Sequence, residues 1–147
     1  MTSVLQALKT SHHVTERVYT VTPGISVRQA AILMREMNIG SLPVLDNGEV
    51  VGIITERDIT FKLVTEGVDP ATVIVAEYMT PDPLCVPPEM EVTDCLNLMK
   101  EKRIRHVPVL EKNRLIGLIS MRDVLHTVLR DNELLAQQFE AYIIGNR

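Results

Sequence analysis

The chain carries an internal repeat at a constant offset of 65 residues. Matching residues recur in order and without a gap. Examples are Pro43 and Pro108, Val44 and Val109, Gly52 and Gly117, Ile54 and Ile119, and Arg57-Asp58 and Arg122-Asp123. Two copies of one supersecondary unit usually bury their apolar faces against each other, and a seam between similar halves is a natural place for a small ligand. We therefore expect one compact unit built from two similar halves.

The composition supports a packed core and argues against nucleic acid as the main ligand. Hydrophobic residues make up 46% of the 147 residues, whereas aromatic residues make up only 3% and tryptophan is absent. Proteins usually bind single-stranded nucleic acid by stacking bases on aromatic side chains, and this chain has few aromatic side chains to do so. The formal net charge of −4 also disfavours binding along a phosphate backbone, so any basic site must be local.

The sequence also favours a cytoplasmic protein without a membrane segment. The first residues lack the basic-then-apolar layout of a secretory signal, and no apolar run approaches the length of a membrane span. Cys85 and Cys95 have no cysteine counterparts in the first copy, so we interpret them as reduced small residues, with a redox switch as the alternative. Because neighbouring side chains point apart, His12 and His13 predict a surface loop and no metal site.

The first copy predicts the order strand, helix, strand, strand, helix. Ser26 and Gln29 have the spacing of a capping box, and apolar residues follow at helical spacing as far as Met37, where Asn38 and Gly40 end the pattern. An Asn-Gly pair at 47–48 predicts a hairpin turn. The expected strands are 18–21, 41–45 and 50–54, and the expected helices are 26–37 and about 55–66. The apolar strand 50–54 should be covered on both faces.

The second copy repeats this order, and the chain divides into five expected regions. The second-copy strands are 84–86, 107–110 and 115–120, with a helix around 92–99 and a closing helix at 121–129. The regions are an N-terminal extension (1–14), the first repeat (15–68), a linker with a short helix or turn (69–80), the second repeat (81–130) and a helical tail (131–147). Each end either packs on the chain's own core or contacts a protein partner. Few basic residues in the tail favour protein over membrane.

Several motifs resemble the signature of a CBS domain, a module named after cystathionine β-synthase. Residues 39–44 (Ile-Gly-Ser-Leu-Pro-Val) and 52–58 (Gly-Ile-Ile-Thr-Glu-Arg-Asp) resemble one copy, and residues 104–109 and 117–123 resemble a second. Tyr-Met-Thr-Pro at 78–81 also resembles the family. The resemblance covers about residues 15 to 130. It implies an α+β fold of two β-α-β-β-α repeats packed as one pseudo-two-fold module.

The resemblance further implies a regulatory function. Family pairs have two equivalent clefts at the seam that bind adenosine-containing ligands such as AMP, ADP, ATP, S-adenosylmethionine or NADH, and stand-alone pairs form disc-shaped homodimers. We therefore expect a nucleotide-sensing module, a homodimer that needs no cofactor and signals to an unidentified regulated protein. The alternatives are a scaffold protein with vestigial clefts and a minor hydrolase or transferase acting on nucleotides. The sequence contains no P-loop and no dinucleotide fingerprint, so we do not expect an enzyme.

Thr55 with Asp58, and Ser120 with Asp123, form the central candidate site. Each pair stands at the start of a predicted helix, where hydroxyl and backbone N–H groups can donate to phosphate, and an ionised carboxylate can accept both hydroxyls of a ribose. By resemblance, the hydroxyl residue contacts ribose or phosphate and the aspartate holds the ribose. The alternative is that these residues are ordinary helix caps and first-turn carboxylates.

The two copies differ most just before their central strands. Arg105-His106 in the second copy stands where the first has Gly40-Ser41. By resemblance this segment lines the cleft, and an arginine can clamp a phosphate with two hydrogen bonds. We therefore predict that the second copy is the better phosphate site. A solvated surface is the alternative for the arginines.

The remaining predicted ligand residues come from the same segments. Val21, Ile39 and Pro43 are candidates for sandwiching adenine, with core packing as the alternative. The first copy could need Arg57 or Arg122 to complete its site. The full predicted set is Thr20, Val21, Ile39, Ser41, Pro43, Thr55, Arg57, Asp58, Arg105, His106, Pro108, Ser120, Arg122 and Asp123.

Overall fold

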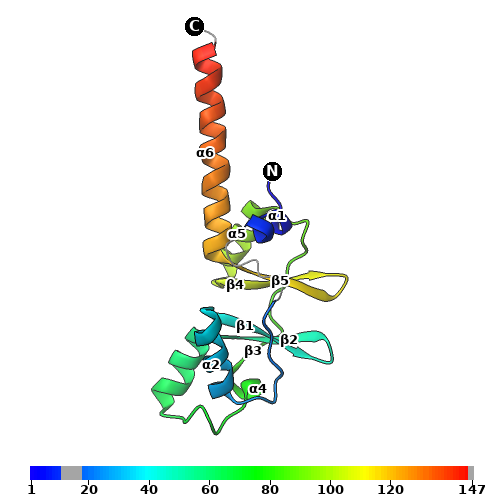
Figure 1. The fold of residues 1–147 in the computed structure, drawn as a ribbon, viewed down its shortest axis with the longest axis vertical. Coiled ribbons are helices and arrows are strands. Elements are labelled where there is room, and N and C mark those ends of the chain that lie inside the picture. The colour runs from blue at the N-terminus through cyan, green and yellow to red at the C-terminus, as the bar shows by residue number, and fades with distance from the viewer. Residues whose placement is uncertain (11–17, 146–147) are drawn as a thin grey trace.

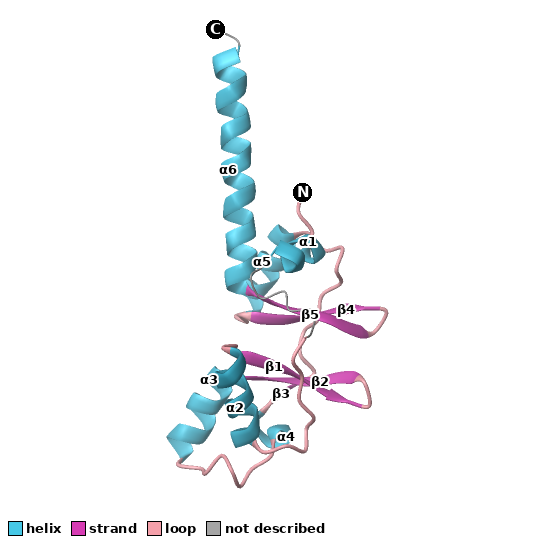
Figure 2. Ribbon diagram, in the orientation of Figure 1, coloured by secondary structure: helices cyan, strands magenta, loops and turns pink. Residues whose placement is uncertain are grey.

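The computed structural model of the chain describes residues 1–10 and 18–145, with side chains through residue 141. The described part has an α+β architecture of two halves. Each half is a β-hairpin covered on its outer face by helices, and the two hairpins lie face to face (Figures 1 and 2). His12 and His13 lie outside the described residues.

The first half contains the elements predicted between residues 26 and 66. They are α2 (Val27–Met37), β1 (Ser41–Asp46), β2 (Glu49–Thr55), α3 (Glu56–Asp58) and η1 (Ile59–Val64). The expected capping box forms, because the Gln29 N–H donates to Ser26 Oγ at 3.1 Å and the Ser26 N–H donates to Gln29 Oε1 at 3.1 Å. Asn38 ends α2 in the left-handed region at φ 54°. Asn47 and Gly48, both at positive φ, make the hairpin turn.

The second half repeats these elements. They are α5 (Val92–Lys102), β4 (His106–Glu111), β5 (Arg114–Ser120) and α6 (Met121–Gly145). Arg103 ends α5 at φ 56°, where Asn38 ends α2, and Lys112 and Asn113 supply the positive φ angles of the second hairpin turn. The strand pairing has the same register in both halves. For example, Pro43 pairs with Ile53 and Pro108 with Leu118.

The strands predicted at 18–21 and 84–86 are wrong. Each is a single parallel bridge, between Val21 and Val44 and between Val86 and Val109. The Val21 N–H donates to the Pro43 carbonyl at 3.1 Å, and the Val21 carbonyl accepts from the Leu45 N–H at 2.9 Å. A proline two residues later in each copy lacks the N–H that a longer ladder requires.

The closing helix at 121–129 and the tail helix are one helix, α6, rather than two. The junction at 130–133 (Arg-Asp-Asn-Glu) contains no glycine or proline that would end a helix. The hydroxyl of Thr2 donates to Asp131 Oδ1 at 3.0 Å, and beyond that point α6 projects away from the body (Figure 1). Its residues Leu134, Leu135 and Phe139 are exposed, so the tail does not pack on the chain's own core. No helix in the described ranges has the length and hydropathy of a membrane span.

Two short helices outside the predicted repeat are equivalent to each other. They are α1 (Val4–Thr10) and α4 (Val75–Tyr78). The Val4 N–H donates to the Met90 carbonyl at 2.7 Å, and the Val75 N–H donates to the Ile25 carbonyl at 2.9 Å. Met90 and Ile25 are related by the 65-residue offset. The N-terminal extension therefore completes the second half, while the linker completes the first, and α1 has the core-packing role that the sequence left open.

Gly52 and Gly117 let these segments approach the sheets closely. A Cβ at Gly117 would lie 2.7 Å from Leu8 Cδ1, and one at Gly52 would overlap the sulfur of Met79. Beside Gly52, β3 (Thr80–Pro81) pairs with β2. A side chain at Gly117 would have to displace Leu8, and one at Gly52 would have to displace Met79 and would also lie 3.1 Å from the Thr80 carbonyl oxygen.

Each half has its own hydrophobic core. The first core holds Val21, Val27, Ala30, Met34, Leu42, Val44, Ile54, Leu63 and Val75. The second holds Val4, Ala7, Val86, Val92, Cys95, Met99, Val107, Val109, Ile119 and Val124. Because side chains alternate along a strand, Leu42 and Val44 face the first core and Pro43 faces the other hairpin. β2 contacts β5, and Ile53 is buried outside both cores, so the halves meet along these strands.

Candidate functional site

In each half, the segment before the first hairpin strand lies beside the start of the helix that follows the second strand. Ser41 pairs with Thr55 and His106 pairs with Ser120. The Glu56 N–H donates to the Gly40 carbonyl at 2.9 Å. The equivalent bond, from Met121 to Arg105, is 2.7 Å. The structure thus brings together the two segments of each copy that the sequence singled out.

Both aspartates are reciprocal helix caps. The Asp58 N–H donates to Thr55 Oγ1 at 3.1 Å, and the Thr55 N–H donates to Asp58 Oδ2 at 3.0 Å. In the second copy the Asp123 N–H donates to Ser120 Oγ at 3.1 Å, and the Ser120 hydroxyl donates to Asp123 Oδ2 at 2.8 Å. The capping alternative therefore holds for both pairs, and it uses only one carboxylate oxygen of each aspartate.

The second carboxylate oxygens differ between the copies. Asp58 Oδ1 lies 3.2 Å from the ammonium of Lys62 and accepts the Thr80 hydroxyl at 3.5 Å. Asp123 Oδ1 has no hydrogen-bond partner among the described residues. The counterpart of Lys62 is Thr127, which is buried and donates to the Asp123 carbonyl at 3.0 Å. Asp58 is therefore engaged on both oxygens, whereas Asp123 keeps one acceptor oxygen available.

His106 connects the two halves electrostatically. Burial lowers the pKa of His106 below its ordinary value of 6.5. The carboxylates of Glu56 and Asp123 oppose this shift, and the Arg105 guanidinium adds to it. Glu56 belongs to the first repeat, so His106 of the second repeat lies within the electrostatic field of a first-repeat carboxylate.

The three arginines of the predicted set lie at the surface. The Arg57 guanidinium stacks over the Phe61 ring, 4.7 Å from its centroid, which holds the side chain along its own helix. Arg105 and Arg122 are exposed. A phosphate near the start of α6 would meet Arg105 without displacing a contact of this kind.

The predicted adenine-contacting residues are mostly enclosed. Val21 is 7% exposed and lies in the first core, and Ile39 packs against that core. Pro43 and Pro108 are buried on the seam side of their strands, and Ser41 is 3% exposed. Thr20 is half-buried beside Val21.

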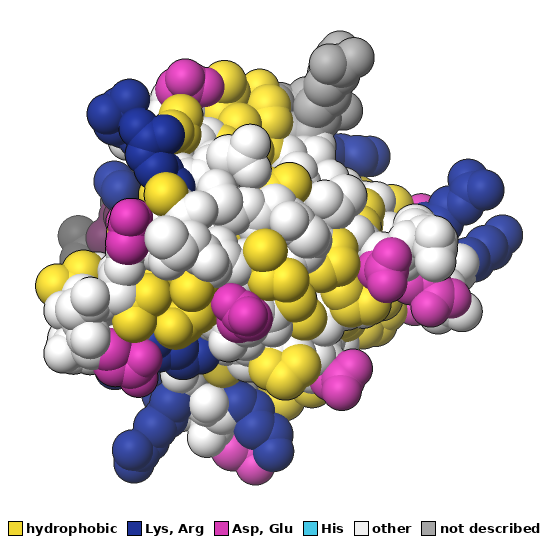
Figure 3. All heavy atoms as spheres, turned by 90° about the horizontal axis from the view of Figure 1, so that it is seen from below, with side chains coloured by type: hydrophobic (Ala, Val, Ile, Leu, Met, Phe, Trp, Pro, Cys, Tyr) yellow, Lys and Arg dark blue, Asp and Glu magenta, His cyan; other side chains and the backbone are white. Residues whose placement is uncertain are grey.

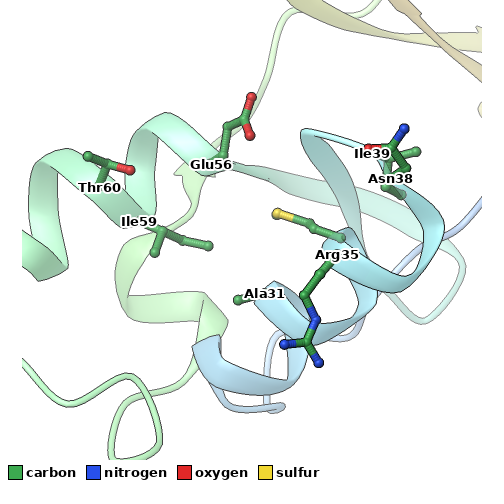
Figure 4. A pocket seen from close by; sticks show the side chains of 8 residues that line it. Ala31, Arg35, Asn38, Ile39, Glu56, Ile59 and Thr60 are labelled. Carbon is green, nitrogen blue, oxygen red and sulfur yellow. The ribbon is translucent and has the colours of Figure 1, made fainter.

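A pocket of about 310 Å³ opens in the first half between the end of α2 and the start of the following helix (Figure 4). Ala31, Met34, Ile39 and Ile59 form its apolar wall, and Arg35, Asn38, Glu56 and Thr60 are polar. Ile39 belongs to the predicted ligand set. The pocket lies within one half, whereas the resemblance implied clefts at the seam. Seen from this end of the molecule, apolar side chains gather in patches, with acidic side chains among them and basic side chains mostly toward the edge (Figure 3).

Sequence reasoning missed three polar residues of the site: Glu56, Lys62 and Thr80. Lys62 stands four residues after Asp58, which is the spacing of a helical ion pair. This ion pair could therefore have been predicted from the sequence. Thr80 is distant in sequence and reaches Asp58 because β3 pairs with β2. Neither Thr80 nor the action of Glu56 on His106 has a local sequence signal.

Comparison with known proteins identifies the repeats. The CBS domain family matches residues 11–65 and 75–130. The solved structure of a CBS-domain protein from Burkholderia ambifaria has 40% sequence identity and a TM-score of 0.83, covering 88% of this chain and 96% of that one. The CBS domain-containing protein YhcV of Bacillus subtilis is 34% identical over 110 residues, covering 75% of this chain and 78% of YhcV.

The chain also matches part of a larger enzyme. It is 36% identical over 124 residues to inosine-5′-monophosphate dehydrogenase of Methanocaldococcus jannaschii, covering 82% of this chain but 24% of that enzyme. The match is confined to the CBS part of the enzyme, and the stand-alone relatives are regulatory rather than catalytic. CBS pairs are in general regulatory modules that bind adenosine-containing ligands. This chain belongs to the CBS domain family and carries two CBS domains in tandem.

Proposed function

We propose that the chain is a cytoplasmic, non-catalytic nucleotide sensor whose principal site lies at Asp123. The observation that carries this proposal is the available Asp123 Oδ1 beside His106 and Arg105, at the end of the seam. An ionised carboxylate only accepts hydrogen bonds, so it suits the donor hydroxyls of a ribose. Its other oxygen is held by Ser120, which fixes the orientation of the carboxylate before the ligand arrives.

The phosphates of the ligand would lie at the start of α6. The helix dipole favours an anion at a helix N-terminus, and α6 is 25 residues long. The N–H groups of Met121 and Asp123 already have acceptors there, so the dipole and nearby cations are the main attraction for a phosphate. Arg105 supplies a planar pair of donors for phosphate. Burial lowers the pKa of His106, and a bound phosphate would raise that pKa because it stabilises the charged imidazolium.

The first-copy site would bind the same ligand class less tightly. A ribose at Asp58 has to compete with the Lys62 ammonium and the Thr80 hydroxyl for Oδ1. Gly40 and Ser41 offer no cation where the second copy has Arg105 and His106. A single preferred ligand, such as ATP or AMP, would then fill the Asp123 site first.

Signalling would follow from the position of the site at the seam. A ligand that contacts both halves binds more tightly to one relative tilt of the hairpins than to another, and it shifts the equilibrium by that difference in affinity. A regulated protein, or a second copy of the chain in a homodimer, would respond to this change in the relative tilt of the hairpins.

A scaffold function is the second candidate, and the exposed tail of α6 favours it. Leu134, Leu135 and Phe139 are each at least half exposed, as expected of a surface that contacts protein. In a pure scaffold the clefts would bind no ligand, so nucleotide binding separates the two functions.

Thermal unfolding of the full chain with AMP, ADP, ATP, S-adenosylmethionine and NADH tests the proposal. A ligand that binds only the folded state at 100 times its Kd adds about 2.7 kcal/mol of stability, which raises the Tm of a domain of this size by roughly 5–10 °C. We expect at least one adenosine-containing ligand to do so, and guanosine phosphates serve as the matched control. If none of the five changes the Tm, the sensor proposal is refuted and the scaffold function is favoured.

A further inference from the structure

The part of α6 that projects from the body carries a stripe of three apolar side chains and one carboxamide. The stripe follows the spacing i, i+3, i+4 and i+7 and consists of Asn132, Leu135, Ala136 and Phe139. At about 100° per residue, all four lie within roughly 60° of one line along the helix. Leu135 is 51% exposed and Phe139 is 60% exposed, and no other described element covers this part of α6 (Figure 1). Such a face is typical of a helix that packs against another element.

The charged side chains on both sides of the stripe are acidic. Asp131 lies about 80° from Phe139 on one side of the helix, and Glu140 lies about 100° from it on the other. Glu133 lies on the same side as Glu140. Arg130 lies about 180° from Phe139, and beyond it α6 contains no lysine or arginine. The stripe therefore complements an apolar surface that has basic residues along its edges.

No cation of the described chain pairs with these carboxylates. Asp131 accepts the hydroxyl of Thr2 at 3.0 Å, which is a neutral donor. Glu133 and Glu140 are exposed and form no ion pair among the described residues. The last turn of α6 contains no basic residue either, so the negative end of the helix dipole has no cation from its own helix. A cationic partner would be attracted to both the carboxylates and the dipole.

The same charges narrow the choice of partner. Two copies of this segment laid side by side would bring their acidic residues together, whether the helices ran parallel or antiparallel. An anionic membrane surface would be repelled as well. A single projecting helix has no groove to receive an extended peptide, whereas a second helix can pack its side chains between those of the first. A helix with basic edges therefore fits the stripe best.

We propose that the α6 tail (residues 131–145) is the docking surface for a basic amphipathic helix of the regulated protein. This deepens the proposed function and rests on its claim that the chain signals to a partner. It does not require nucleotide to be present. α6 starts directly after Ser120 and continues without a break into the tail. Asp123 and Phe139 are about 24 Å apart along this helix at 1.5 Å per residue, so one element joins the nucleotide site to the docking surface.

A designed peptide of about five helical turns serves as the probe for the partner. It carries leucines at the spacing of the stripe and lysines along both edges, and a matched peptide carries glutamates in place of the lysines. Fluorescence anisotropy measures the binding of each peptide to the full chain without nucleotide. We expect the lysine peptide to bind at least about tenfold more tightly, with a smaller preference at high salt. Equal binding, or no binding, would overturn the inference even if nucleotides raise the Tm.

Leu134 and Leu135 provide matched variants that locate the bound peptide. The two leucines are neighbours with 50% and 51% exposure, but Leu134 lies about 140° from Phe139 and outside the stripe. Leu135→Gln should weaken binding of the lysine peptide at least about fivefold, as expected for loss of an apolar anchor, and Leu134→Gln less than about twofold. Equal losses in the two variants would mean that the peptide does not use the stripe, which would overturn the inference.

Sedimentation equilibrium without peptide tests whether a second copy of the chain covers the stripe instead. The wild type, Leu134→Gln and Leu135→Gln should have the same oligomeric state, because the acidic edges oppose pairing of two tails. A change of oligomeric state in Leu135→Gln alone would assign the stripe to a contact between copies and would overturn the inference.

Discussion

Asp58 and Asp123 occupy the same place in the two repeats and make the same capping box, yet they differ in what remains available. Lys62 and Thr80 engage the second oxygen of Asp58 at 3.2 and 3.5 Å, whereas the second oxygen of Asp123 has no partner among the described residues. The residue four positions later decides the difference, since Lys62 reaches back to the carboxylate and its counterpart Thr127 turns to the backbone. Equivalent motifs therefore leave different carboxylate oxygens available, none at Asp58 and one at Asp123 among the described residues.

The helices that follow the two motifs also differ. After Thr55 the chain makes one short α-helical segment and then the π-helical segment Ile59–Val64. After Ser120 it continues as α6 for 25 residues. A long regular helix presents aligned peptide dipoles at its start, and π-helical geometry is a local departure from that alignment. This contrast is a further reason to propose that phosphate binds preferentially at the second copy.

The largest expected effect separates the two aspartates. Asp123→Ala removes the ribose acceptor of the principal site, and hydrogen bonds to a charged group contribute about 1.5–3 kcal/mol, so nucleotide affinity should fall roughly 10- to 100-fold. Asp58→Ala should change the affinity of the tighter of the two sites, the Asp123 site, less than threefold. Both variants lose a helix cap, so the stability of each variant is the control for the other. Equal losses of nucleotide affinity in the two variants would refute the proposed inequality of the sites.

Arg105→Ala should have the next largest effect, and it should depend on the phosphates. Loss of a guanidinium clamp should weaken ATP about tenfold and leave adenosine nearly unchanged, because adenosine has no phosphate. Calorimetric titration with both ligands measures the ratio. A parallel loss for adenosine would assign Arg105 to the fold rather than to phosphate.

The pH dependence of ATP affinity should be smaller, at a few-fold. His106 is neutral at high pH because burial lowers its pKa. A bound phosphate stabilises the charged imidazolium, so binding takes up a proton and affinity should rise as the pH falls from 8 to 6. Part of the pH dependence comes from the ligand itself and is the same for the wild type and for His106→Gln. The additional rise seen in the wild type should be absent from His106→Gln. An unchanged slope in the variant would exclude His106 from the phosphate site.

Lys62→Met should give the smallest change. Without the ammonium, Oδ1 of Asp58 is free to accept from a ribose, and the weaker binding step should tighten roughly two- to threefold, as expected for loss of one partly exposed ion pair. The tight step should stay constant and serves as the internal reference. Weaker binding in this variant would mean that Lys62 contacts the ligand itself.

Local patterns in the sequence predicted much of the fold. The Ser26 capping box, the Asn47-Gly48 turn and the matching hairpins follow from short-range chemistry, and the structure contains them. The sequence did not predict the equivalence of α1 and α4, because their residues are related by an offset of 71, as Val4 and Val75 are, and not by the 65-residue offset of the repeats. The continuity of α6 was also missed, although the junction lacks a helix breaker.

Only the contacts within each short motif of the site could be predicted from the sequence. The pairing of Thr55 with Asp58 follows from spacing, whereas the contact of Thr80 with Asp58 depends on how β3 meets β2. The effect of Glu56 on His106 depends on the packing of one half against the other. Tertiary contacts of this kind have no periodicity in the sequence.

Calorimetric titration of the wild-type chain with ATP tests the central claim most directly, because it counts and ranks the sites in one experiment. Two clefts of unequal capacity should give two resolved steps per chain, with affinities at least tenfold apart. Two steps of equal affinity, or no binding at all, would contradict the account.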